Sequence, residues 1–178
     1  MEGLGKRVWR TLLAGIVAAF AAVSLLSPAP AQADDPAFIS FAGGYFDWNR
    51  QKNTAAEFRL EYQAADKFWI FKPLGGVMGT SDGAWYVFAG IGTDVYFGNR
   101  FVVTPSFAPG YYHHGSGLDL GHELEFRSQI EFAWRFDNRS RLGLAVSHMS
   151  NASIGDTNPG TEAAMVYYSV PIPVMFGQ

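Results

Sequence analysis

A serine, a histidine and a glutamate near the end of the sequence have the residue types and spacing of a hydrolytic triad. His148 and Ser150 stand two positions apart, and Glu162 follows the turn-forming segment 151–160. If 151–160 is the loop of an antiparallel hairpin, Glu162 can lie beside His148, because opposed cross-strand residues have Cβ atoms about 5 Å apart. Acyl transfer uses this set: a histidine takes the serine proton while an acid orients the imidazole.

The segments on either side of that loop have the alternation of β-strands. Leu142, Leu144 and Val146 share a face with His148 and Ser150 if residues 142–151 are extended. In the following segment, Glu162 begins a face that continues with alanine, valine and tyrosine. Two apolar faces therefore end in polar residues. The amide of Asn151, next to the serine, could donate to a developing oxyanion. The simpler alternative is that each polar residue meets water at a strand end.

The first 33 residues have the pattern of a secretory signal peptide. A basic start is followed by the uncharged apolar run Leu12–Leu26 and by Ala31-Gln32-Ala33, which predicts cleavage before Asp34. The remaining chain, 34–178, has 15 acidic and ten basic residues, so nothing in its charge favours nucleic acid. Cysteine is absent, which excludes disulfides and cysteine metal sites.

Eight segments of the exported chain read as strands, and their connections alternate between shorter and longer. This pattern predicts an all-β fold, an eight-stranded antiparallel up-and-down β-barrel covering 34–178. The predicted strands are 37–48, 54–64, 68–78, 84–97, 101–113, 122–136, 142–151 and 162–172.

The two faces of these strands indicate which side meets lipid. One face carries large apolar and aromatic residues, whereas the other carries small residues and charges of both signs. A soluble barrel or sandwich would turn the charged face to water. Small residues on the charged face fit a narrow, packed lumen better, so we expect a transmembrane barrel. The charges expected inside are Glu57, Arg59, Glu61, Glu123, Glu125, Arg127, Glu131 and Arg135.

This orientation places the candidate triad toward lipid, near the end with the longer loops. In an outer-membrane barrel that end lies outside the cell. Polar groups facing hydrocarbon are expensive and are therefore candidates for function. Because the abundant lipid with acyl esters in the Gram-negative outer leaflet is lipid A, location and chemistry together suggest a lipid A esterase.

The motif His148-Met149-Ser150-Asn151, with Asn158-Pro159-Gly160 and Glu162 after it, resembles the PagL family of lipid A 3-O-deacylases. The resemblance implies cleavage of the 3-O acyl chain of lipopolysaccharide, with Ser150 as nucleophile, His148 as base and then acid, and Glu162 orienting His148. It implies an oxyanion hole built from the Asn151 side chain and a backbone N–H at Ser153, where the family pattern leads us to expect glycine. Asn158, Pro159 and Gly160 would shape the loop.

Two other functions remain open. A non-enzymatic barrel, structural or adhesive, would let His148 and Glu162 fall out of register or onto opposite faces. A lipid A acyltransferase would need a second lipid as donor and an internal pocket for its chain. No cofactor or metal is expected, although His113, His114 and His122 flank one loop. The expected partners are lipid A and other outer-membrane lipids. Whether the barrel forms a homodimer is left open.

Overall fold

The computed structural model describes residues 35–177, so the predicted signal peptide lies outside the described residues. The strands are β1 (Phe38–Phe46), β2 (Ala55–Gln63), β3 (Lys72–Thr80), β4 (Trp85–Gly92), β5 (Val95–Phe97), β6 (Phe101–His113), β7 (Leu124–Arg135), β8 (Arg141–Ser150) and β9 (Thr161–Pro171). The helix α2 (Ile172–Met175) follows β9. Within the described residues, no helix is long and apolar enough to cross a membrane.

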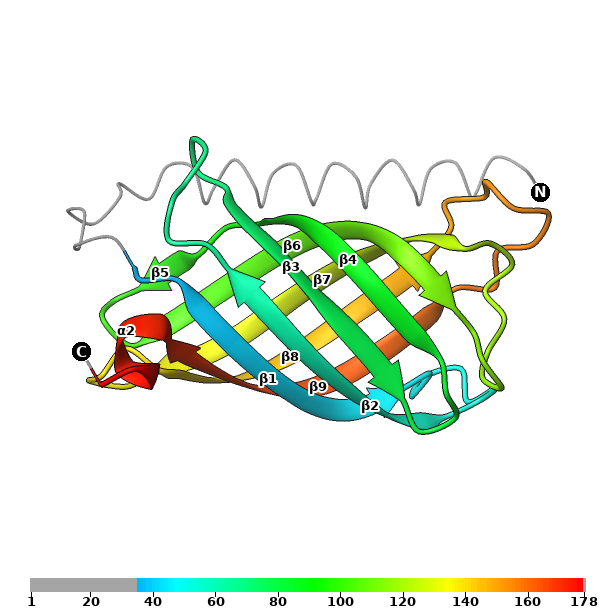
Figure 1. Ribbon diagram of the computed structural model, residues 1–178, viewed down its shortest axis with the longest axis horizontal. Coiled ribbons are helices and arrows are strands. Elements are labelled where there is room, and N and C mark those ends of the chain that lie inside the picture. Colours follow the sequence, from blue (N-terminus) through cyan, green and yellow to red (C-terminus); the bar gives the residue numbers. More distant parts are fainter. Residues whose placement is uncertain (1–34, 178) are drawn as a thin grey trace, which may run out of the picture. The chain divides into compact units, whose positions relative to one another are not determined.

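The strands form a closed antiparallel barrel of eight staves (Figure 1). Each stave pairs with its neighbours in sequence, β1 pairs with β9, and β4 pairs with β6. β4 and β5 pair with successive parts of β6, and therefore act as one stave interrupted at Thr93 and Asp94. The predicted eight-stranded antiparallel barrel is confirmed.

The two longest connections, 114–123 and 151–160, lie at one end of the barrel, although 64–71 at the other end is longer than the short connection the sequence predicts there. We call the end with connections 47–54, 81–84, 114–123 and 151–160 the loop end, and the end with 64–71, 98–100 and 136–140 the turn end. The prediction that β3 begins at Phe68 is wrong. Trp69 has a positive φ of 59°, and Phe68 and Phe71 close a tight turn through paired backbone hydrogen bonds. β3 therefore begins at Lys72.

The exterior of the barrel is apolar. Side chains alternate between exposed and buried along β2, β4 and β8, and most of the exposed ones are apolar, with His148 as the exception. Aromatic side chains are exposed near both ends, including Tyr45 and Trp85 at the loop end and Phe101 and Trp134 at the turn end. An apolar band flanked by aromatic girdles is typical of a transmembrane barrel.

The lumen is filled by paired charges rather than left open. Arg59 forms an ion pair with Glu57 and donates to Gln129 (2.6 Å), and Arg127 pairs with Glu61 at 2.8 Å. One luminal cavity, lined by Gln63 and Gln129 among others, holds about 10 Å³, room for roughly one water. One predicted luminal charge is misplaced: Glu123 precedes β7 and is exposed in the loop.

A carboxylate at the interruption between β4 and β5, that of Asp94, lies inside the barrel at the turn end. Asp94 pairs with Lys72 at 3.0 Å and with Arg141 at 3.1 Å, and it accepts a 2.8 Å hydrogen bond from Thr104. Period two over 84–97 already places Asp94 on the inward face with Tyr86 and Phe88, so its facing follows from the alternation and the interruption of the backbone pairing at 93–94 does not.

Candidate active site

His148 and Glu162 form a hydrogen-bonded pair on the outer face of the barrel. The two residues are directly opposed in the β8–β9 register, as the hairpin interpretation predicts. His148 Nδ1 lies 3.1 Å from Glu162 Oε1, and the two side chains are 46% and 22% exposed. With Nδ1–H donating to the carboxylate, Nε2 keeps its lone pair. The imidazole is therefore held in the tautomer that a general base requires.

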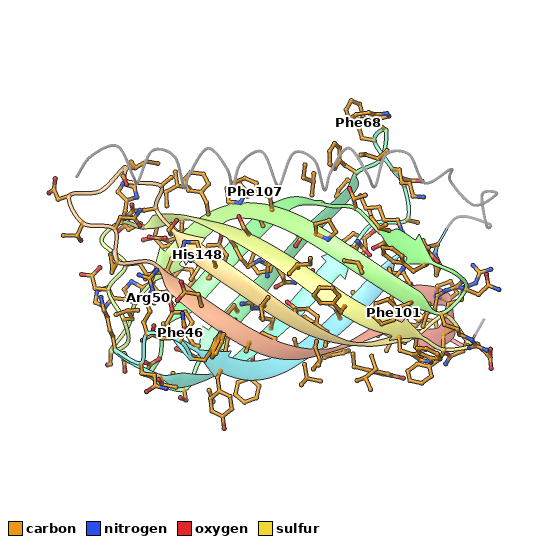
Figure 2. The ribbon with its side chains drawn as sticks, turned by 180° about the vertical axis from the view of Figure 1, so that it is seen from behind. Phe46, Arg50, Phe68, Phe101, Phe107 and His148 are labelled. Carbon is orange, nitrogen blue, oxygen red and sulfur yellow. The ribbon has the colours of Figure 1, made fainter. Side chains whose placement is uncertain are left out.

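Arg50, which the sequence interpretation missed, holds the other side of Glu162. Its Nε donates to Oε2 and its Nη2 to Oε1, both at 3.0 Å, and its Nη1 donates to the Pro159 carbonyl. Figure 2 shows Arg50 and His148 at the same end of the barrel. A bidentate guanidinium fixes the plane of a carboxylate. Arg50 thus orients the acid that orients the histidine, although it lies 112 positions away from Glu162 in sequence.

The loop that carries Arg50 is anchored by a buried carboxylate. Asp47 is fully buried, and its Oδ2 accepts hydrogen bonds from the backbone N–H groups of Lys52 (2.6 Å) and Asn53 (2.8 Å). Its Oδ1 accepts a longer bond of 3.4 Å from Thr161, the residue before Glu162. Asp47 therefore connects the 47–54 loop to the start of β9. An aspartate before a mixed polar stretch is the only sequence signal for this anchor.

Ser150 ends β8 on the same side as His148. Two residues along an extended strand separate their Cα atoms by about 7 Å. Ser150 is half-buried and stands opposite Phe126 of β7. Among residues 35–177, no hydrogen bond joins its hydroxyl to His148. A second hydroxyl, that of the exposed Ser128, lies directly opposite His148 on β7.

The Asn151 side chain is committed to the loops rather than to the outer face. Asn151 is fully buried, and its Nδ2 donates to the carbonyls of Leu120 (2.9 Å) and Thr157 (2.8 Å). Its Oδ1 accepts from the Ser153 N–H at 2.9 Å. Both predicted oxyanion donors, the Asn151 amide and the Ser153 N–H, are thus engaged with each other or with backbone. In this arrangement Asn151 ties the 151–160 loop to the 114–123 loop.

Asn158 has an amide that is less engaged. Its Oδ1 accepts from the backbone N–H of Asn151 at 3.2 Å, whereas its exposed Nδ2 reaches only the Ser153 hydroxyl, at 3.4 Å. One hydrogen of that nitrogen therefore remains available for a ligand. The sequence interpretation gave Asn158 a loop-shaping role, which the bond to Asn151 fits, and did not consider it as a donor.

Gly160 is packed against the imidazole. It has a φ of 61°, and a Cβ built there would lie 3.0 Å from His148 Cε1 and 3.6 Å from Nε2. Gly98 provides a control, because it has a similar φ of 66° but open space around its Cβ. We expect Gly160→Ala to lower kcat by about 10- to 100-fold through displacement of the ring. Gly98→Ala should carry only the backbone strain, which folding yield and thermal stability would report. Equal activity in the two variants would contradict this steric role.

Arg50 can be tested with substitutions that separate charge from geometry. We expect Arg50→Ala to lower kcat about tenfold with little change in KM, because Glu162 loses its fixed plane. Arg50→Lys should recover only part of the loss, since an ammonium cannot bond both carboxylate oxygens in the same fork geometry. Lys52→Ala is the control, because Lys52 is an exposed cation of the same loop. An equal loss in Lys52→Ala would assign the effect to loop charge instead.

A comparison with protein families shows which family the chain belongs to. The model described as lipid A 3-O-deacylase (PagL) matches residues 46–171, which include every candidate site residue. The chain belongs to this family. Among characterised members, it is similar to the lipid A deacylase PagL of Pseudomonas aeruginosa, with 28% identity over 87 residues. That match covers 49% of this chain and 42% of the relative, so the chain aligns with less than half of the relative's length.

Solved structures show the same fold. The crystal structure of the outer membrane enzyme PagL matches with a TM-score of 0.59 and 19% identity, over 76% of this chain and 99% of that one. A de novo designed transmembrane β-barrel matches with a TM-score of 0.52 and 13% identity, over 78% and 98%. Because a designed barrel matches nearly as well, the likeness in fold carries no information about activity, which has to be argued from the site.

Proposed function

We propose that this protein is a lipid A 3-O-deacylase of the outer membrane, a serine esterase in which Ser150, His148 and Glu162 form the triad. The observation that carries the proposal is the in-register His148–Glu162 pair at 3.1 Å on the outer face, with Ser150 two positions further along the same face of β8. Membership of the family described as lipid A 3-O-deacylase supports lipid A as the substrate and the 3-O position as the site of cleavage. The geometry supports the assignment of roles.

The reaction divides into two transfers. Nε2 of His148 takes the proton of Ser150 Oγ as Oγ attacks the ester carbonyl, and Glu162 stabilises the imidazolium. Collapse of the tetrahedral intermediate breaks the bond to the sugar oxygen, which leaves with the proton from His148. A water then attacks the acyl-serine, again with His148 as base. The products are a free fatty acid and a lipid A with one additional hydroxyl.

The hydrogen bond between Ser150 and His148 would form when substrate binds. Catalytic hydrogen bonds are often long or misaligned in free enzymes and tighten in the complex. We assign this step to rotation of the Ser150 side chain, because both residues share the outer face of β8. Ser128 is the competing hydroxyl at this histidine, and the comparison of Ser150 with Ser128 is therefore part of the test.

The oxyanion donor we assign is the Asn158 side chain. Its Nδ2 is exposed and weakly engaged, whereas the Asn151 amide and the Ser153 N–H are both committed. A side-chain amide aimed at the position where charge develops lowers the barrier substantially. Asn151 then acts indirectly, because its backbone N–H donates a hydrogen bond to Asn158 Oδ1 and so positions the Asn158 side chain.

The position of the site suits an ester that stays in the membrane. The pair lies at the loop end of a band of exposed apolar side chains, which is the level where acyl esters meet headgroups. We infer that the loop end faces outward, as in other outer-membrane barrels. The rival acyltransferase needs an internal acyl pocket, and the small luminal cavity offers no room for a chain among the described residues.

Mass analysis of lipid A after incubation with the purified, detergent-folded protein tests the proposal. We expect loss of one 3-hydroxyacyl chain as free fatty acid, from the 3-O position. Unchanged lipid A would contradict the enzyme assignment and favour a structural or adhesive barrel. Transfer of the chain to a second lipid, without fatty acid release, would favour an acyltransferase.

A further inference from the structure

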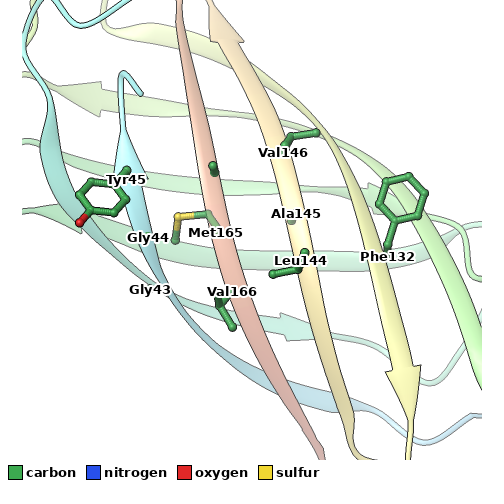
Figure 3. A pocket seen from close by; sticks show the side chains of 10 residues that line it. Gly43, Gly44, Tyr45, Phe132, Leu144, Ala145, Val146, Met165 and Val166 are labelled. Atoms are coloured by element: carbon green, nitrogen blue, oxygen red, sulfur yellow. The ribbon is translucent and has the colours of Figure 1, made fainter. Parts of the chain in front are cut away.

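A groove of about 490 Å³ lies on the outer surface of the barrel, over β1, β9, β8 and β7 (Figure 3). Its lining is almost entirely apolar. Outward-facing residues of these strands form it, among them Gly43, Tyr45, Phe132, Leu144, Val146 and Ala164. It therefore lies in the surface that faces lipid rather than in the lumen.

The groove exists because two outward positions are small. Gly43 and Ala164 occupy its floor, while Tyr45 (64% exposed) and Phe132 (45% exposed) rise on its two sides. A Cβ at Gly43 would meet only Phe58 Cδ1 at 3.9 Å, so a side chain would fit there. On the neighbouring strand β2, the position opposite Gly43 is filled by the exposed ring of Phe58.

The groove begins where the candidate active site ends. Val146 and Ala164 are the next outward-facing residues after His148 and Glu162, and they oppose each other in the register. From Ser150 to Val146 the strand rises by about 14 Å. The groove continues from there toward the turn end along Leu144 and Val166. This is the direction that an acyl chain takes from an ester held at the loop end.

We propose that this groove binds the acyl chain of the ester under attack, and that Gly43 and Ala164 set the chain length the enzyme prefers. The proposal rests on the proposed function of the His148 site. A chain lying in the groove exchanges contacts with mobile lipid for contacts with fixed side chains, which holds the carbonyl next to Ser150. A chain too short to span the distance to Val146 gains nothing from the groove.

Larger side chains in the groove should therefore slow the hydrolysis of esters with long acyl chains more than that of esters with short ones. In detergent micelles, we expect Ala164→Leu and Gly43→Leu each to lower the ratio of p-nitrophenyl myristate to p-nitrophenyl butyrate hydrolysis at least fivefold, measured as kcat/KM. Ala89→Leu is the matched control, because Ala89 is an exposed outward alanine of β4, outside the groove. That variant should keep the wild-type ratio. Two groove variants guard against one that fails to fold.

The possible outcomes distinguish a failure of the groove proposal from a failure of the proposed active site. An unchanged ratio in both groove variants, or the same fall in Ala89→Leu, would overturn the groove proposal while Ser150-dependent lipid A deacylation still stands. If Ser150→Ala hydrolyses both esters like the wild type, the proposed active site fails instead. A selective loss of myristate hydrolysis in both groove variants, with the control unaffected, is the result that supports the groove.

Discussion

Ser150→Ala is expected to reduce release of fatty acid from lipid A by about 1,000-fold or more. Loss of a serine nucleophile removes the covalent route altogether, and only residual catalysis from binding and polar contacts remains. Because Ser150 makes no hydrogen bond to His148 among the described residues, the substitution should not disturb the His148–Glu162 pair. Fatty acid release, measured on micellar lipid A, is the direct readout.

Ser128→Ala is the control for the Ser150→Ala measurement. Ser128 is exposed on the outer face and directly opposes His148 from β7, so it is the other hydroxyl that the imidazole could deprotonate. We expect Ser128→Ala to stay within about twofold of wild type, the range of an ordinary surface change. Loss of activity in Ser128→Ala with retention in Ser150→Ala would move the nucleophile to β7.

Glu162→Gln is expected to lower kcat by about 100- to 10,000-fold. The amide keeps the volume of the side chain but loses the charge that stabilises the imidazolium, and it permits the wrong histidine tautomer. The same change breaks the ion pair with Arg50, which leaves a guanidinium facing an amide. KM should change little, because Glu162 contacts His148 and Arg50 rather than the acyl chain.

Glu123→Gln is the matched control for the carboxylate. Glu123 is an exposed glutamate at the same end of the barrel, in the 114–123 loop, so it reports what loss of one negative charge does to lipid A binding there. Folding of each variant can be followed by the altered gel mobility of an unheated barrel. A folded Glu162→Gln protein with wild-type kcat would show that the carboxylate has no part in the reaction.

Period-two patterns predicted the parts of this structure that depend on local alternation. The barrel, its strand number and the outward facing of its apolar residues follow from which side chains alternate along each strand. The opposition of His148 and Glu162 follows as well, because a hairpin register is set by its loop and by the faces that must match. The triad prediction rests on this geometry and waits for its experimental test.

The errors came from interactions that alternation does not encode. Residues 68–71 are as apolar as a strand, yet Trp69 adopts a positive φ and turns the chain. The pairing of β4 with β6 stops at Gly92 and resumes at Val95, although period two runs through the break and points Asp94 toward Lys72 and Arg141 in the lumen. Alternation predicts the facing of a residue but not where the backbone pairing is interrupted.

The surroundings of the site were harder to foresee than its centre. Arg50 reaches Glu162 from another loop, and its position depends on how Asp47 folds the 47–54 segment. Asn151 was expected to face the substrate, but its amide bonds the carbonyls of two loops. In both cases the partner is a backbone atom or a residue distant in sequence, which motif spacing cannot specify.

The filled lumen bears on how a lipid substrate would reach the proposed active site. With ion pairs occupying the bore of the described barrel, nothing of lipid size travels through it, and the candidate site opens sideways onto the bilayer. The proposed enzyme would then meet its lipid substrate by diffusion in the plane of the membrane. Its turnover would follow the mole fraction of ester-bearing lipid in the leaflet, not the amount of that lipid per volume of solution. Dilution by inert neighbouring lipids would slow such an enzyme even when the total quantity of substrate is unchanged.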